Sequence, residues 1–204
     1  MKKTLLTIII LFLGTFSVSA QLYRYLDTQQ GLSSRRVIAV EKDQKGYMWF
    51  LTQEGVDRYN GKQFTNYILS DGNRPVLHFP NLSQLHIDNQ DDIWVTGKNG
   101  FIFKYNQMLD KYDLVMNFAD SLKTKRRLPL THTSIDRQNN LWLCTRNAQY
   151  IYRTDTKHVI KLETPIKEKV FYIEQAKGNR YFFGTRENVY VASLKGNRLV
   201  LEPE

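Results

Sequence analysis

Short runs of bulky apolar residues, separated by polar turns, recur along this chain of 204 residues. Three of the runs are centred on tryptophan and read YMWFLT, DIWVTG and NLWLCT. They are apolar on successive residues, whereas a neighbouring segment such as KQFTNY alternates apolar and polar residues. Alternation is typical of a strand with one solvated face, and a continuous apolar run indicates a strand covered on both faces. The pattern therefore predicts many short strands of two kinds.

The tryptophan runs belong to a repeat of about 40 to 48 residues. Trp49, Trp94 and Trp142 are separated by 45 and 48 residues, and an aspartate lies six residues before each. A fourth copy, RYFFGTRENVYV, has Phe182 at the tryptophan position. Such self-similarity at a fixed period is the signature of a repeat architecture.

The predicted repeat signature comprises turn glycines, the anchor aromatic residues and the residues at fixed distances from them. Its members are Asp43, Gly46, Trp49, Thr52, Gly55, Tyr59, Gly61, Asp88, Trp94, Gly100, Tyr105, Asp136, Trp142, Thr145, Tyr152, Phe182, Gly184 and Thr185. We expect the aspartates to accept backbone hydrogen bonds in a tight turn before the tryptophan strand. A calcium-binding or catalytic role for these carboxylates is the weaker alternative.

Each copy reads as four antiparallel strands joined by tight turns, with Asn60-Gly61 as a strong hairpin signal. A strand covered on both faces requires a neighbouring sheet on each side. Four-stranded sheets repeated radially satisfy this requirement, so the predicted fold is an all-β propeller. The four blades are expected at residues 31–69, 79–117, 128–165 and 168–203.

Residues 22–27, LYRYLD, form an additional predicted strand outside the four blades. A closed ring of four blades would have no place for it. In larger propellers, an N-terminal strand often completes the last blade. We therefore expect the propeller region 21–204 to be part of a larger propeller of the seven-bladed type, with further blades beyond residue 204.

Residues 1–20 have a positive start, an apolar run and small residues before Gln21, which is the pattern of a secretory signal peptide. An uncleaved anchor is the alternative. Periplasmic export makes nucleic acid an unexpected partner despite the net charge of +9. The single cysteine, Cys144, cannot form an internal disulfide and is expected to be a small buried apolar residue.

The sequence predicts no catalytic residues, no metal site and no cofactor. Four histidines are present, and each is expected to be structural or solvent-exposed: His86 in an alternating strand, His132 before a strand, and His78 and His158 in loops or turns. Basic residues cluster at 123–127, and this cluster is either a solvated loop or a contact for an anionic ligand or membrane surface.

The first copy, from Gly31 to Tyr67, closely resembles the two-component regulator propeller repeat. It carries GLSS, then DQKGYMWFLT, then GVDRYNG. Val56 and Asn60 are mild departures from that pattern, and Leu51 replaces a usual glycine. Kelch, WD and sialidase Asp-box patterns do not fit. The second and third copies match moderately and the fourth only in FFGT.

This resemblance implies the N-terminal periplasmic sensor region of a Bacteroidetes hybrid two-component system. It implies an oligosaccharide ligand, a membrane-bound histidine kinase as partner, and a homodimer as one form of assembly. The ligand-contact residues are unknown, but the long connections at 70–81 and 117–130 are candidate sites. Two alternatives remain: an exported scaffold that binds a protein partner, and a propeller enzyme acting on glycans.

Overall fold

The computed structural model describes residues 23–72, 74–77, 82–124 and 128–203, so the predicted signal peptide lies outside the described residues. The described residues form four antiparallel sheets of four strands each. The first two sheets consist of β1 (Val37–Lys42), β2 (Met48–Thr52), β3 (Val56–Tyr59) and β4 (Phe64–Tyr67), and of β7 (Leu82–Ile87), β8 (Ile93–Gly97), β9 (Phe101–Asn106) and β10 (Lys111–Asn117). The last two consist of β11 (His132–Ile135), β12 (Leu141–Cys144), β13 (Gln149–Arg153) and β14 (His158–Lys161), and of β15 (Tyr172–Gln175), β16 (Arg180–Gly184), β17 (Val189–Lys195) and β18 (Arg198–Leu201).

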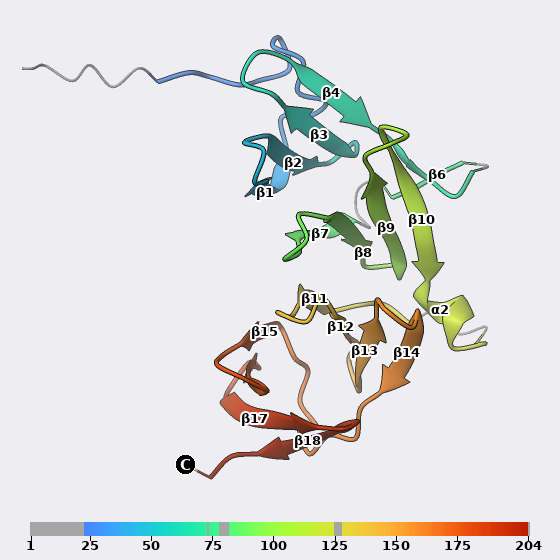
Figure 1. Ribbon diagram of the computed structural model, residues 1–204, viewed down its shortest axis with the longest axis vertical. Coiled ribbons are helices and arrows are strands. Elements are labelled where there is room, and N and C mark those ends of the chain that lie inside the picture. The colour runs from blue at the N-terminus through green and yellow to red at the C-terminus, as the bar shows by residue number, and fades with distance from the viewer. Residues whose placement is uncertain (1–22, 73, 78–81, 125–127, 204) are drawn as a thin grey trace, which may run out of the picture.

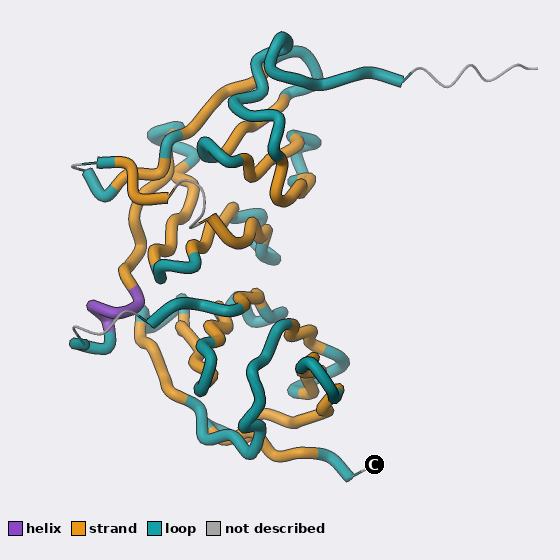
Figure 2. The backbone as a smooth tube through the Cα atoms, turned by 180° about the vertical axis from the view of Figure 1, so that it is seen from behind, coloured by secondary structure: helices purple, strands orange, loops and turns teal. Residues whose placement is uncertain are grey.

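The four sheets are blades that follow one another along an arc (Figure 1). Each blade is a meander in which strands consecutive in sequence pair with one another. The first strands β1, β7, β11 and β15 lie next to one another along the inner side of the arc. A small hairpin of β5 (Leu69–Ser70) and β6 (Pro75–Leu77) and a short helix α2 (Phe118–Ser121) lie in the connections between blades (Figures 1 and 2). The predicted all-β propeller of four-stranded blades is confirmed.

The hydrophobic core lies between the blades. One cluster joins blades one and two, a second joins blades two and three, and a third joins blades three and four. Trp49 packs against Tyr105 of the next blade with ring centroids 4.8 Å apart, and Trp142 packs against Tyr181 of the next blade at 4.5 Å. Each tryptophan therefore fills the interface toward the following blade.

The aspartate of each repeat holds its tryptophan as well as the preceding turn. Asp43 accepts the backbone N–H of Tyr47 on Oδ1 at 2.8 Å and the indole N–H of Trp49 on Oδ2 at 2.8 Å. Asp88 and Asp136 make the equivalent indole bonds at 2.9 and 3.0 Å, together with two backbone N–H bonds each. The expected backbone bonds are confirmed. The indole bond explains why the aspartate lies six residues before the tryptophan in all three repeats.

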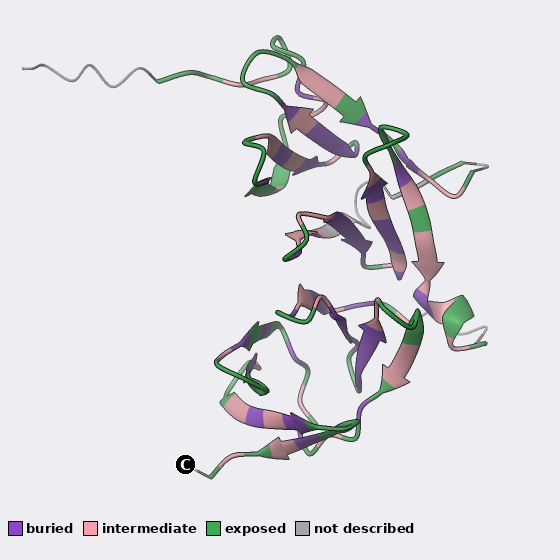
Figure 3. Cartoon of the chain, viewed as in Figure 1, coloured by how far each residue is buried: buried purple, intermediate pink, exposed green. Residues whose placement is uncertain are grey.

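Burial on both faces of the anchor strand is confirmed for the two central blades only. All described residues of β8 and β12 are buried, whereas β16 alternates between buried and exposed (Figure 3). Phe182, at the tryptophan position, is 39% exposed, while Tyr181 and Phe183 are buried against blade three. Phe182 lies on the face where a following blade would pack, and no described residue covers that face. The residues of β16 therefore alternate in burial because blade three covers one of the two faces of this strand.

The predicted strand at 22–27 has no strand partner in the described structure. Tyr23 and Tyr25 are 82% and 87% exposed. The segment is held locally by the Arg24 guanidinium, which donates to the carbonyl oxygen of Gly61 at 2.9 Å and lies over the ring of Tyr59. Its pairing with a later blade stays a prediction. None of the helices in the described residues is long and apolar enough to cross a membrane.

Candidate functional site

The connections at one end of blades two, three and four surround a cavity of about 750 Å³. Three of its walls are the β8–β9, β12–β13 and β16–β17 turns, which contribute Lys98, Arg146 and the pair Arg186 and Glu187. The remaining wall consists of residues 129–131 and 168–171 from the two connections between blades. Loops held at the ends of rigid strands are where binding residues of repeat folds concentrate. This loop-end cavity is the candidate functional site.

The repeated threonine fixes the geometry of these turns. The backbone N–H of Thr145 donates to the carbonyl oxygen of Ala148 at 2.9 Å, and its Oγ1 accepts the N–H of Ala148 at 3.1 Å. Thr185 makes the same pair of bonds with Asn188, at 2.9 and 3.0 Å. The signature threonine is thus a turn residue, and the exposed residue that follows it projects from a fixed backbone.

The connections are also tied down at the base of the cavity. Thr131 donates through its backbone N–H to the carbonyl oxygen of Cys144 at 2.7 Å and through Oγ1 to that of Val170 at 3.0 Å. The backbone N–H of Phe171 donates to Gly184 at 2.9 Å, yet the Phe171 ring is 48% exposed. Lys169 Nζ lies 4.5 Å from the centroid of that ring. The cavity therefore combines an exposed aromatic surface with fixed cations.

One of the two carboxylates at the cavity is already engaged. Glu168 accepts hydrogen bonds from the side chains of Thr185 at 2.5 Å, Asn188 at 3.0 Å and Tyr190. These donors lower the pKa of the Glu168 carboxyl, with Thr185 as the largest cause, so it remains ionised. The negative charge of Glu168 is therefore bound by side chains of blade four.

A second depression, of about 430 Å³, lies along the inner strands of all four blades. His86 Nε2 and Thr133 Oγ1 are 2.9 Å apart, and Gln84 Nε2 lies 3.2 Å from His132 Nδ1. Burial lowers the pKa of His86 to about 3 and that of His132 to about 4, and the proximity of His132 further lowers that of His86. Both imidazoles are therefore neutral near pH 7. They join blades two and three as structural residues.

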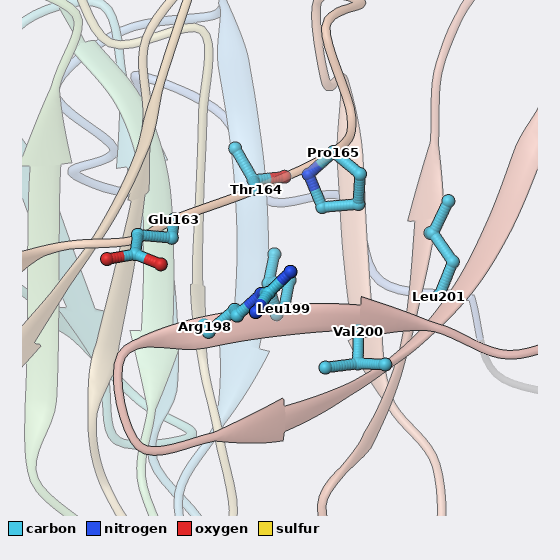
Figure 4. A pocket seen from close by; sticks show the side chains of 7 residues that line it. All are labelled: Glu163, Thr164, Pro165, Arg198, Leu199, Val200 and Leu201. Carbon is cyan, nitrogen blue, oxygen red and sulfur yellow. The ribbon is translucent and has the colours of Figure 1, made fainter.

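A third groove lies beside the edge strand β18 (Figure 4). Thr164 and Pro165 lie on one side of the strand, and Val200 points to the other (Figure 4). The backbone of Glu163 pairs with this strand through a bond from the N–H of Leu199 at 2.8 Å. The groove brings together few polar side chains, so it offers a ligand little specificity.

The other residues singled out in the sequence are the cysteine, two further histidines and the basic cluster. Cys144 is fully buried, as predicted, and burial raises the pKa of its thiol. His158 was expected in a loop or turn, but it is the exposed first residue of β14, because the turn closes at Lys157 with a positive φ of 57°. His78 and much of the basic cluster at 123–127 lie outside the described residues. Among the residues that the structure describes, no group of three His, Cys, Asp or Glu side chains could hold a metal ion.

The two long connections singled out in the sequence contribute little to the cavity. Residues 70–81 form part of the β5–β6 hairpin, with 73 and 78–81 outside the described residues. Of the described residues of the second connection, Pro129 and Leu130 alone line the cavity. The sequence reasoning missed the short turns after β8, β12 and β16. The available signal was a basic residue directly after the Thr145 and Thr185 anchors.

The blades resemble those of solved extracellular domains of hybrid two-component systems. The extracellular domain of the hybrid two-component system BT3049 from B. thetaiotaomicron superposes with a TM-score of 0.68 at 19% identity, over 88% of this chain and 26% of that one. That of BT4673 from the same organism has a TM-score of 0.68 at 14% identity, over 89% and 27%. The chain has a β-propeller fold.

Virginiamycin B lyase from Staphylococcus aureus, an enzyme, has a TM-score of 0.60 at 13% identity, over 82% of this chain and 55% of that one. Proteins with different roles thus share this fold, so the likeness shows the fold alone. This chain spans about a quarter of the length of the two extracellular domains. No family model and no curated protein sequence matches it.

Proposed function

We propose that this chain belongs to the extracytoplasmic ligand-sensing region of a two-component signalling system and that its ligand is an oligosaccharide. The observation that carries the proposal is the loop-end cavity, which is surrounded by turns of three consecutive blades. Its volume of about 750 Å³ lies within the range of roughly 300 to 1,000 Å³ of small-molecule sites. The fold likeness to extracellular domains of hybrid two-component systems supports the sensor role.

The mechanism would be a shift between conformational populations. A ligand that contacts the turns of blades two, three and four together stabilises the arrangement in which these turns converge. That preference would be passed through further blades to a membrane-bound kinase. In this proposal, residues 1–20 direct export to the periplasm and residues 22–27 complete a further blade of the propeller.

The test is a thermal-shift screen of the purified protein against neutral and acidic oligosaccharides of two to six sugar units. Binding to the folded state alone adds about 2.7 kcal/mol to the free energy of unfolding at a ligand concentration of 100 Kd. At least one oligosaccharide should therefore raise Tm in a concentration-dependent way. Absence of any shift across both classes at millimolar concentrations would exclude an oligosaccharide sensor.

A protein-binding scaffold is the second candidate, because the outward face of blade four is only partly covered. Phe182 and Val189 on this face are 39% and 71% exposed. A pull-down from envelope extracts that captures one partner through this face, without any oligosaccharide response, would favour the scaffold. Turnover of an oligosaccharide during the screen would instead indicate an enzyme.

A further inference from the structure

Three consecutive blades place a cation at the same position of the same turn. Lys98 follows Gly97 at the end of β8, Arg146 follows Thr145 after β12, and Arg186 follows Thr185 after β16. All three side chains are exposed and line the loop-end cavity. Because the turns are fixed by backbone hydrogen bonds, the cations are presented as a row across the blades.

The charge of the cavity is not balanced from within. Its lining contains four cations, with Lys169 as the fourth, and two carboxylates. Glu168 is engaged by Thr185, Asn188 and Tyr190. The ion pairs found among the described residues join other side chains, at Arg58, Lys104, Lys111 and Arg180. The lining therefore carries a net positive charge, four cations against two carboxylates, and among the described residues none of these cations forms an ion pair.

The remaining groups of the cavity suit a ligand with an apolar surface and hydroxyl groups. The half-exposed ring of Phe171 supplies an apolar wall beside Lys169. Aromatic walls with a few fixed polar groups are typical of small-molecule sites. Arginine can bind a planar carboxylate or a sulfate through two parallel hydrogen bonds, which gives both strength and orientation.

From this arrangement we infer that the loop-end cavity selects acidic oligosaccharides, which span the blades and place at least two anionic groups on Lys98, Arg146 and Arg186. The inference rests on the proposed function and narrows it to one class of ligand. The anionic group could be a uronic acid carboxylate or a sulfate ester, since the same cations accommodate both.

The experiment measures Kd by calorimetry for two matched pairs of probes. The first pair is a galacturonic acid trimer and its fully methyl-esterified form, which keeps the chain but removes the charges. The second pair is a galactose trimer with and without sulfate esters. We expect at least one acidic member to bind tenfold or more tightly than its neutral counterpart, and the affinity to fall as salt is raised. The pair that shows the difference identifies the anionic group.

Three variants locate the site. Arg146→Gln and Arg186→Gln should each weaken binding of the acidic probe by about 10- to 150-fold, which corresponds to the roughly 1.5 to 3 kcal/mol of a hydrogen bond to a charged group. Arg137→Gln removes an exposed arginine of blade three at the opposite end of the strands, in the β11–β12 turn, and should leave Kd unchanged. Equal melting temperatures of all three variants would verify that the fold is intact.

The outcomes separate the two proposals. Equal affinity for neutral and acidic probes, or no effect of Arg146→Gln and Arg186→Gln, overturns the acidic selectivity and leaves an oligosaccharide sensor in place. Inorganic sulfate that competes at the same concentration as the acidic trimer also overturns it, because the site would then bind any anion. Failure of every saccharide in the wider screen overturns the proposed function itself.

Discussion

The carboxylate of Asp136 accepts hydrogen bonds from backbone and side-chain donors in a buried position. Oδ1 accepts the backbone N–H groups of Gln138 and Asn140 at 3.0 and 2.9 Å, and Oδ2 accepts the indole N–H of Trp142 at 3.0 Å. One side chain therefore closes the turn, fixes the tryptophan rotamer and satisfies donors that would otherwise be buried without partners. The same arrangement at Asp43 and Asp88 shows that the aspartate–tryptophan pair is a unit of the repeat.

At this scale we predict that Asp136→Asn lowers the free energy of unfolding by about 2 to 4 kcal/mol. The amide keeps one acceptor oxygen, and its NH₂ group would face donors. Urea unfolding followed by tryptophan fluorescence measures the change. The control Asp120→Asn, an exposed residue of α2, should change stability by no more than about 0.5 kcal/mol. Equal effects of the two substitutions would refute a special role for the buried carboxylate.

Neighbouring blades are joined by polar contacts of their inner strands as well as by apolar packing. His86 of β7 lies 2.9 Å from Thr133 of β11, and the Thr133 and Thr96 hydroxyls are 2.7 Å apart. At the outer side of blades one and two, Asp110 accepts hydrogen bonds from Tyr67, Tyr105 and Arg58. Blade order and register are therefore specified by directional bonds between elements.

Because the buried His86 has a pKa of about 3, the interface between blades two and three should weaken in acid. The unfolded state, with a histidine pKa near 6.5, binds a proton between about pH 6.5 and 3, whereas the folded state does not. Stability contributed by neutral His86 is thus present above pH 6.5 and is lost as pH falls. From pH 7 to pH 5 we expect a loss of about 1 to 2 kcal/mol.

Chemical unfolding at both pH values measures this dependence. His86→Gln should reduce the difference between the two pH values, although the variant is less stable at pH 7. The exposed His158 provides the control, and His158→Gln should leave the difference unchanged. An unaltered pH dependence in His86→Gln would show that another group is responsible.

The whole molecule is an arc of blades whose terminal faces differ from its interfaces. Between blades, aromatic residues from both sheets are buried, as at Trp142 and Phe183 with ring centroids 5.8 Å apart. On the outward face of blade four, Phe182 of β16 and Val189 of β17 are exposed. Such a face favours association with another apolar surface.

We therefore predict that truncation of the two adjacent phenylalanines of β16 lowers stability to very different extents. Phe183→Ala removes a fully buried ring and should lower the free energy of unfolding by about 3 to 5 kcal/mol. Phe182→Ala should cost less than about 1 kcal/mol and reduce self-association at high protein concentration. Urea unfolding and light scattering measure the two effects. Comparable destabilisation by both variants would mean that the face of Phe182 is covered in solution.

The sequence by itself determined the repeat, the four-stranded blades and the positions of the anchor strands. These features depend on local periodicity, turn residues and the fixed interval between Asp43 and Trp49, all of which are expressed within one repeat. Burial of Cys144 followed from the same apolar run. The interval predicted a turn, but not the indole bond, because the side-chain direction depends on the strand it enters.

Only the tertiary structure decided which residues meet across blades. Lys98, Arg146 and Arg186 are more than 35 residues apart in sequence, and stacking of successive blades brings their turns to one cavity. The contrast between buried Phe183 and exposed Phe182 likewise depends on whether another sheet packs on each face. A sequence specifies the two faces of a strand through alternation, but the neighbour that covers each face is set by the assembly of the whole chain.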